Sequence, residues 1–114
     1  MSTKALELRR TRLSARRACD LLRSLAHADR LVLLCELSQG ERSVGELEEL
    51  AGVRQPSLSQ QLGVLRREGL VKTRRDGKRI YYRLGGEDAL KIIEVLHSIF
   101  CEPRRETGKV AMRR

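Results

Sequence analysis

Residues 43–84 contain, without any spacer, the signals for a short helix, a second helix and a β-hairpin, and this order limits the folds open to the chain. Ser-Val-Gly-Glu at 43–46 has the form of a capping box, in which the serine and glutamate side chains each bind the other's backbone amide. A helix is therefore expected to begin there. It should end near Gly52, because glycine most readily adopts the left-handed conformation that closes a helix. Its inward-facing residues would be Leu47, Leu50 and Ala51.

A second helix of about three turns is expected after a short turn. Pro56 can occupy its first turn at no cost, because the amide that proline lacks would have no partner there. The buried stripe of this helix would be Leu58, Leu62 and Leu65. The other face begins with side chains that can bind base edges and phosphates in a major groove, namely Arg54, Gln55, Ser57, Ser59, Gln60 and Gln61.

After Gly69 the polar and apolar residues alternate, as they do in β-strands. Asp-Gly at 76–77 separates two such runs and is typical of a two-residue hairpin. A basic hairpin beside a reading helix can hold the phosphate backbone or a minor groove, and its expected contacts are Arg75, Lys78 and Arg79. A basic hairpin alone is usually only a solvated surface. In this order, however, the pieces predict a mainly α fold with a β-hairpin wing, a winged helix-turn-helix that binds double-stranded DNA.

The composition is consistent with that partner. The chain of 114 residues suits one domain, and its formal charge of +9 favours a polyanion. One Phe, two Tyr and no Trp argue against single-strand binding, which uses exposed aromatic side chains for stacking. No apolar run approaches the length of a membrane span. We therefore expect a cytoplasmic protein with no membrane partner.

Helical patterns flank the reading device on both sides. Apolar residues recur at helical spacing over 14–26, after a basic segment, 1–12, that we expect to be partly flexible. The folded domain should span 13–102, and the basic tail at 103–114 is also expected to be flexible.

Two further helices are expected, one before and one after the helix-turn-helix and hairpin of residues 43–84. Asp29 can cap a helix that is apolar around almost its whole circumference, and is therefore central and buried, before Gly40 ends it. The last helix follows Asp88 and stops before Pro103. Because it is apolar on more than one face, it needs a second partner. We expect a homodimer through the first and last helices, which would place two reading helices on successive major-groove faces.

Three cysteines, Cys19, Cys35 and Cys101, do not form a disulfide framework in a cytosolic chain. Each can be a small core residue, a metal ligand or a redox centre. His97 and Cys101 have the i, i+4 spacing of shared ligands, but two ligands on one helix are few. The residues themselves predict no metal site and no cofactor, and they leave the role of the thiols open.

These motifs resemble the arsenic-repressor (ArsR/SmtB) family of bacterial winged-helix regulators over about residues 21–101. The likeness rests on the segments 25–31, 54–62, 65–71 and 75–84. Ala28 stands where the family often has proline, and the Cys-x-Cys metal site of many members is missing from 44–47. The chain is most similar to the dithiol, persulfide-sensing branch, which shares Ser-Val-Gly-Glu-Leu and a helix ending in Ile-Phe-Cys.

The resemblance implies a function. It suggests a dimeric repressor, not an enzyme, in which Cys35 and Cys101 respond to reactive sulfur species by forming a disulfide or polysulfide bridge and releasing operator DNA. Cys19 falls outside the shared pair. Two alternatives remain. One is a repressor that senses zinc, cadmium or arsenic, and the other is a DNA-binding protein without a ligand.

Overall fold

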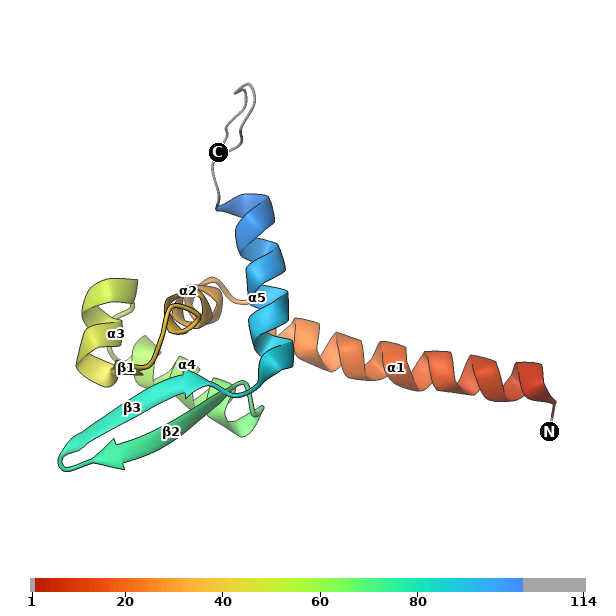
Figure 1. Cartoon of the computed structure of the whole chain (residues 1–114), viewed down its shortest axis with the longest axis horizontal. Coiled ribbons are helices and arrows are strands. Elements are labelled where there is room, and N and C mark those ends of the chain that lie inside the picture. Colours follow the sequence, from red (N-terminus) through yellow and green to blue (C-terminus); the bar gives the residue numbers. More distant parts are fainter. Residues whose placement is uncertain (1, 102–114) are drawn as a thin grey trace, which may run out of the picture.

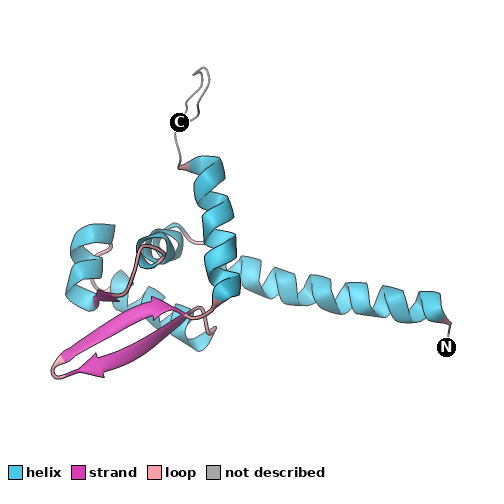
Figure 2. Cartoon of the chain, viewed as in Figure 1, coloured by secondary structure: helices cyan, strands magenta, loops and turns pink. Residues whose placement is uncertain are grey.

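The computed structural model describes residues 2–101, which form five helices and a three-stranded sheet (Figures 1 and 2). The expected tail at 103–114 lies outside the described residues. The elements follow in the order α1 (Thr3–Leu25), α2 (Ala28–Leu37), β1 (Arg42–Ser43), α3 (Val44–Ala51), α4 (Ser57–Arg67), β2 (Val71–Asp76), β3 (Arg79–Leu84) and α5 (Glu87–Phe100). The winged helix-turn-helix is therefore confirmed, with α3 and α4 as its two helices and β2 and β3 as the wing.

Helix α3 begins and ends as the sequence predicts. The Ser43 hydroxyl accepts from the Glu46 amide at 3.2 Å, and the Glu46 carboxylate accepts from the Ser43 amide at 2.8 Å. Gly52 closes the helix with a φ of 71°. The prediction that Leu50 faces inward is wrong, because this residue is 56% exposed. On this helix only Leu47 is buried. The short helix packs against α2, β1 and β3.

The other four helices begin at residues different from those expected, and α5 begins at Glu87, with Asp88 inside its first turn. Helix α1 starts at Thr3, capped by the Ser2 hydroxyl, because the basic residues that follow are good helix formers when solvated. The side chain that caps α2 is His27, whose Nδ1 accepts from the Asp29 amide at 3.2 Å. Asp29 itself lies in the first turn of α2 and binds another helix. Pro56 precedes α4 as its cap residue, so it lies just outside the first turn.

The sheet has the order β1-β3-β2, with both pairs antiparallel. Strand β1 is only two residues long, too short to produce an alternating pattern in the sequence. Asp76 pairs with Arg79, so the hairpin loop is Gly77-Lys78, one residue later than expected. Gly77 has a φ of 66°, and the left-handed residue therefore stands first in the loop.

The core gathers around α2, which packs against α1, α3, α4, α5 and β3. Leu33, Leu34 and Leu37 of α2 are buried, as are Leu58, Leu62 and Leu65 of α4, the stripe that the sequence predicts. The circumference of α2 is not wholly covered, since Val32 is 42% exposed. Helix α1 contributes only its last turns to the core and projects away from the domain (Figure 1). None of the described helices is both long and apolar enough to cross a membrane.

Candidate DNA-binding surface and thiol pair

Four of the predicted DNA-binding side chains are exposed at the start of the second helix. Ser59 and Gln60 lie on α4, and Arg54 and Gln55 lie in the turn that precedes it. Gln55 is partly engaged in the helix itself, because its Oε1 accepts from the Ser59 amide at 3.0 Å. That bond supplies a partner for one of the free amides at the start of α4, where Pro56 offers no side-chain cap. The side-chain amide nitrogen of the exposed Gln55 can still act as a donor.

Two of the predicted DNA-binding side chains on α4 point inward instead. Gln61 is 9% exposed and accepts from Arg30 Nη1 at 3.0 Å, so its expected place on the open face is wrong. Ser57 is half-buried, and its hydroxyl donates to Asp29 Oδ2 at 2.8 Å. The burial of Gln61 could have been predicted, because it shares the helical spacing of Leu58, Leu62 and Leu65. No sequence pattern indicated that Asp29 and Arg30 of α2 bind these side chains.

The tip of the wing is basic and open. Arg75, Lys78 and Arg79 are exposed, and none of them forms an ion pair with another residue in the range 2–101. Arg74 differs, because it pairs with Glu41 at 2.8 Å and its guanidinium lies 4.5 Å from the centre of the Tyr81 ring. The three cations lie at the far end of the hairpin, where a ribbon can reach phosphates beside the groove that a reading helix occupies. Lys72 and Arg83, farther from the tip, are exposed as well and form no ion pair within residues 2–101.

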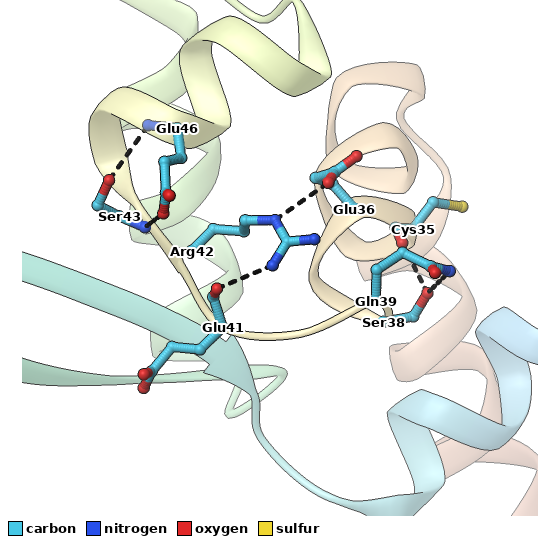
Figure 3. A network of polar contacts seen from close by, with 8 residues as sticks. All are labelled: Cys35, Glu36, Ser38, Gln39, Glu41, Arg42, Ser43 and Glu46. Atoms are coloured by element: carbon cyan, nitrogen blue, oxygen red, sulfur yellow. Dashed lines mark hydrogen bonds and ion pairs between the residues drawn. The ribbon is translucent and has the colours of Figure 1, made fainter.

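A polar network joins the end of α2 to β1 and α3 (Figure 3). Arg42 Nε donates to Glu36 Oε2 at 3.1 Å, and Arg42 Nη1 donates to the Glu41 carbonyl at 3.0 Å. The Cys35 carbonyl accepts from the Ser38 hydroxyl at 2.6 Å. Cys35 therefore lies at the end of a helix that is bound to the first strand and, through the Ser43 capping box, to the start of α3.

The three cysteines are free thiols in different surroundings. Cys35 is half-buried on α2, whereas Cys101 at the end of α5 and Cys19 on α1 are exposed. Burial raises the pKa of the Cys35 thiol, and the nearby Cys101 and Glu36 raise it further. Since α5 packs against α2, the fold brings Cys35 and Cys101 into electrostatic range, while Cys19 is not among the groups that act on Cys35. Within residues 2–101 no three side chains of the metal-binding types come together.

A capped two-helix reader, a basic wing and a charge of +9 define this chain as a winged helix-turn-helix DNA-binding protein. Residues 27–73 match the family model described as "Bacterial regulatory protein, arsR family". The biofilm growth-associated repressor of Agrobacterium fabrum is 59% identical over 83 residues, which cover 73% of this chain and 71% of that protein. The chain belongs to the arsR family of bacterial regulatory proteins, and it is a transcriptional regulator, not an enzyme.

Two solved structures resemble the fold. The transcriptional repressor BigR from Xylella fastidiosa is 47% identical with a TM-score of 0.72, over 88% of this chain and 94% of that one. Reduced HlyU from Vibrio cholerae is 38% identical with a TM-score of 0.77, over 82% of this chain and 98% of that one. The family resemblance inferred from the motifs is thus confirmed.

Proposed function

We propose that this regulator is a homodimeric repressor whose affinity for operator DNA depends on the oxidation state of Cys35 and Cys101. The observation that carries the proposal is the packing of α5 on α2, with Cys101 near enough to raise the pKa of the Cys35 thiol. Direct action as a repressor is supported by the similarity to two proteins that bear this name. As inducer we propose a persulfide or an inorganic polysulfide, which the resemblance to the dithiol branch implies.

The chemistry needs only the two thiols and the sulfur donor. Cys101 is the more accessible of the pair, so its thiolate attacks the outer sulfur of R–S–SH, gaining that sulfur and releasing R–S⁻. Cys35 then attacks the inner sulfur of the new persulfide. A disulfide forms and HS⁻ leaves, so the two thiols lose the two electrons that the donated sulfur gains.

A longer bridge follows when both thiols first take a sulfur from the donor. The persulfide anion on one cysteine then attacks the other cysteine's own sulfur and again displaces HS⁻. The bridge that remains contains one extra sulfur. Because it spans a greater distance than a disulfide, it requires less movement of the backbone.

The dimer is proposed from the apolar surface that the single chain leaves open. On α5, Val95 and Ile99 are 55% and 50% exposed, and Phe100 is 78% exposed. On α1, the leucines at 6, 8, 13 and 22 are also exposed. Large apolar side chains gathered on two helices are typical of an interface. A second copy covering both helices would hold two α4 helices at a fixed separation on DNA.

Release of DNA would follow from tying α5 to α2. The bridge would join α5, the proposed dimer helix, to α2. Arg42 binds the end of α2 to β1, and β1 leads directly into α3. Reduced and bridged proteins would then favour different separations of the two readers, and DNA would bind the reduced one more tightly.

The test combines cysteine mapping with DNA binding. The probe is the duplex most enriched from a random pool by the reduced protein, and the oxidant is sodium tetrasulfide. We expect a Cys35–Cys101 bridge in the peptide map and a tenfold or greater loss of affinity, on the order of 1.4 kcal/mol. Cys101→Ser should bind the duplex normally and ignore tetrasulfide, whereas Cys19→Ser, the matched control, should respond like the unaltered protein.

Other outcomes would favour the two alternatives. Release by stoichiometric zinc, cadmium or arsenite, with no effect of tetrasulfide, would replace this proposal by a metal sensor. Equal affinity in reduced and tetrasulfide-treated protein, without any bridge, would indicate a DNA-binding protein that lacks a ligand.

A further inference from the structure

Two neighbouring residues of α2 hold the reading helix at two points. Asp29 Oδ2 accepts from the Ser57 hydroxyl at 2.8 Å, and Arg30 Nη1 donates to Gln61 Oε1 at 3.0 Å. Ser57 and Gln61 are four residues apart, so they lie on the same face of α4, one turn from each other. The two bonds therefore attach the N-terminal half of α4, the part that enters a major groove in helix-turn-helix proteins.

Arg30 also binds the end of α1. Its Nε donates to the Ser24 carbonyl at 2.6 Å, and its Nη2 to the Arg23 carbonyl at 3.5 Å. These carbonyls belong to the last turn of α1. The Arg23 carbonyl also accepts from the Ala26 amide at 3.3 Å, and the Ser24 carbonyl lies beyond the regular bonds of the helix. Ser24 and Gln61 are both buried, at 8% and 9% exposure. One half-buried guanidinium thus joins α1, α2 and α4.

The bonds from Asp29 and Arg30 constrain the rotation of α4 about its axis, which the apolar stripe alone does not determine. Leu58, Leu62 and Leu65 determine which face of α4 is buried, but apolar contacts have no preferred direction. Hydrogen bonds do have one. A rotation of α4 about its axis would change the direction in which the exposed Ser59 and Gln60 point, and so which base edges they could reach in a groove.

We propose that Asp29 and Arg30 are positioning residues that set the rotation of the reading helix on DNA. Ser57 and Gln61 then contribute to sequence specificity through these two residues and not by touching bases. The inference rests on DNA binding alone and is independent of the thiol pair.

Replacing glutamine by glutamate at two adjacent positions separates positioning from base reading. In Gln61→Glu the new carboxylate still accepts from Arg30, now with charge assistance, so affinity for the selected duplex should stay within about threefold. In Gln60→Glu, the matched control, the charge faces DNA and should reduce affinity at least about tenfold. If Gln61→Glu loses as much affinity as Gln60→Glu, Gln61 faces the DNA and the proposal fails.

Loss of the Arg30 hydrogen bonds should lower sequence specificity and leave the electrostatic attraction of the protein to phosphates unchanged. For Arg30→Gln we expect the ratio of affinities for selected and random duplexes to fall about tenfold, with the same slope of log K against log salt. A slope smaller by about 0.9 would mean that Arg30 binds a phosphate, which would overturn its assignment.

Asp29 provides a second test that does not depend on Arg30. Asp29→Asn keeps an oxygen that can accept from Ser57 and should retain the specificity ratio, whereas Asp29→Ala should lose it. Thermal unfolding of each variant shows whether the fold is kept. Where Asp29→Ala does not fold, the Gln61→Glu and Gln60→Glu pair decides alone. Equal ratios for folded Asp29→Asn and Asp29→Ala would contradict a positioning role.

Discussion

Glu41 and Arg74 form a two-pronged ion pair that fastens the loop before β1 to the first strand of the wing. Arg74 Nη2 lies 2.8 Å from Glu41 Oε1, and Arg74 Nε donates to both carboxylate oxygens at 2.9 Å. The Arg74 guanidinium also lies over the Tyr81 ring, 4.5 Å from its centre. Arg74 is therefore engaged in stabilising the wing, whereas Arg75, Lys78 and Arg79 near the tip form no ion pair among the described residues.

The ion pair makes the wing sensitive to acid. The hydrogen bond from Arg74 lowers the pKa of Glu41 below its ordinary value of 4.5. The pair therefore stabilises the folded protein fully above pH 4.5, and this contribution is lost as the pH falls through the lowered folded pKa. We expect Glu41→Gln to lower the urea midpoint at pH 7 by a small amount. The difference from the unaltered protein should shrink as the pH falls below 4.5 and Glu41 takes up a proton.

Glu48→Gln is the matched control for this pH series, since Glu48 is an exposed carboxylate on α3 with no ion pair among the described residues. Its urea midpoint should follow that of the unaltered protein throughout. A Glu41→Gln effect as large at pH 3 as at pH 7 would exclude the charge of Glu41 as its cause.

The capping box should contribute measurably to stability. Ser43→Ala removes the hydroxyl that accepts from the Glu46 amide and leaves that buried end of α3 without its cap. We expect a loss of about 1 kcal/mol in the free energy of unfolding, measured by urea denaturation. Ser14→Ala, on the exposed part of α1, should change it by less than about 0.5 kcal/mol. Equal effects of the two substitutions would contradict a role for the cap.

Two leucines of α3 should differ sharply although the sequence pattern treats them alike. Leu47 is fully buried and Leu50 is 56% exposed. Leu47→Ala should therefore cost about 2–5 kcal/mol in unfolding free energy, because it leaves a cavity in the core. Leu50→Ala should stay within about 0.5 kcal/mol. A large loss at Leu50 would mean that another chain or segment covers it in solution.

The sequence was most informative where structure depends on neighbours along the chain. The capping box, the closing glycine and the apolar stripe of α4 each involve residues within one or two helical turns, and each is found where expected. Gln61 shows the limit of such reasoning. Its polarity suggested an open face, whereas its spacing from Leu58 and Leu65 placed it on the buried one.

Long-range contacts were beyond the reach of the pattern. The Arg30 to Gln61 and Glu41 to Arg74 bonds join residues 31 and 33 positions apart, and no local spacing marks them. The same holds for the closeness of Cys35 and Cys101, which depends on how α5 packs against α2. The motifs predicted these two residues as a pair only through the resemblance to a family.

The surroundings of Cys35 predict slow reaction with an alkylating agent. Burial raises the pKa of this thiol and so reduces the fraction of thiolate, the form that reacts. With iodoacetamide at pH 7.5, Cys35 should be modified several-fold more slowly than the exposed Cys101 and Cys19, as followed by peptide mass spectrometry. The rate at Cys35 should keep rising with pH beyond its ordinary pKa of 9.0. Modification of all three thiols at one rate would contradict the burial of Cys35.

Arg79 at the wing tip should contribute to DNA affinity by binding phosphates. Arg74, farther from the tip, should instead act by stabilising the wing. Arg79 is exposed without an ion-pair partner among residues 2–101, so Arg79→Ala should weaken binding to selected and random duplexes alike. The slope of log K against log salt should fall by about 0.9 for each phosphate that Arg79 neutralises in the bound complex. Arg74→Ala should instead leave the slope nearly unchanged and reduce stability, because its charge is already paired with Glu41. Fluorescence anisotropy over a salt series measures both slopes. An unchanged slope for Arg79→Ala, with a reduced one for Arg74→Ala, would reverse these assignments and place the DNA backbone along the strands instead of at the tip.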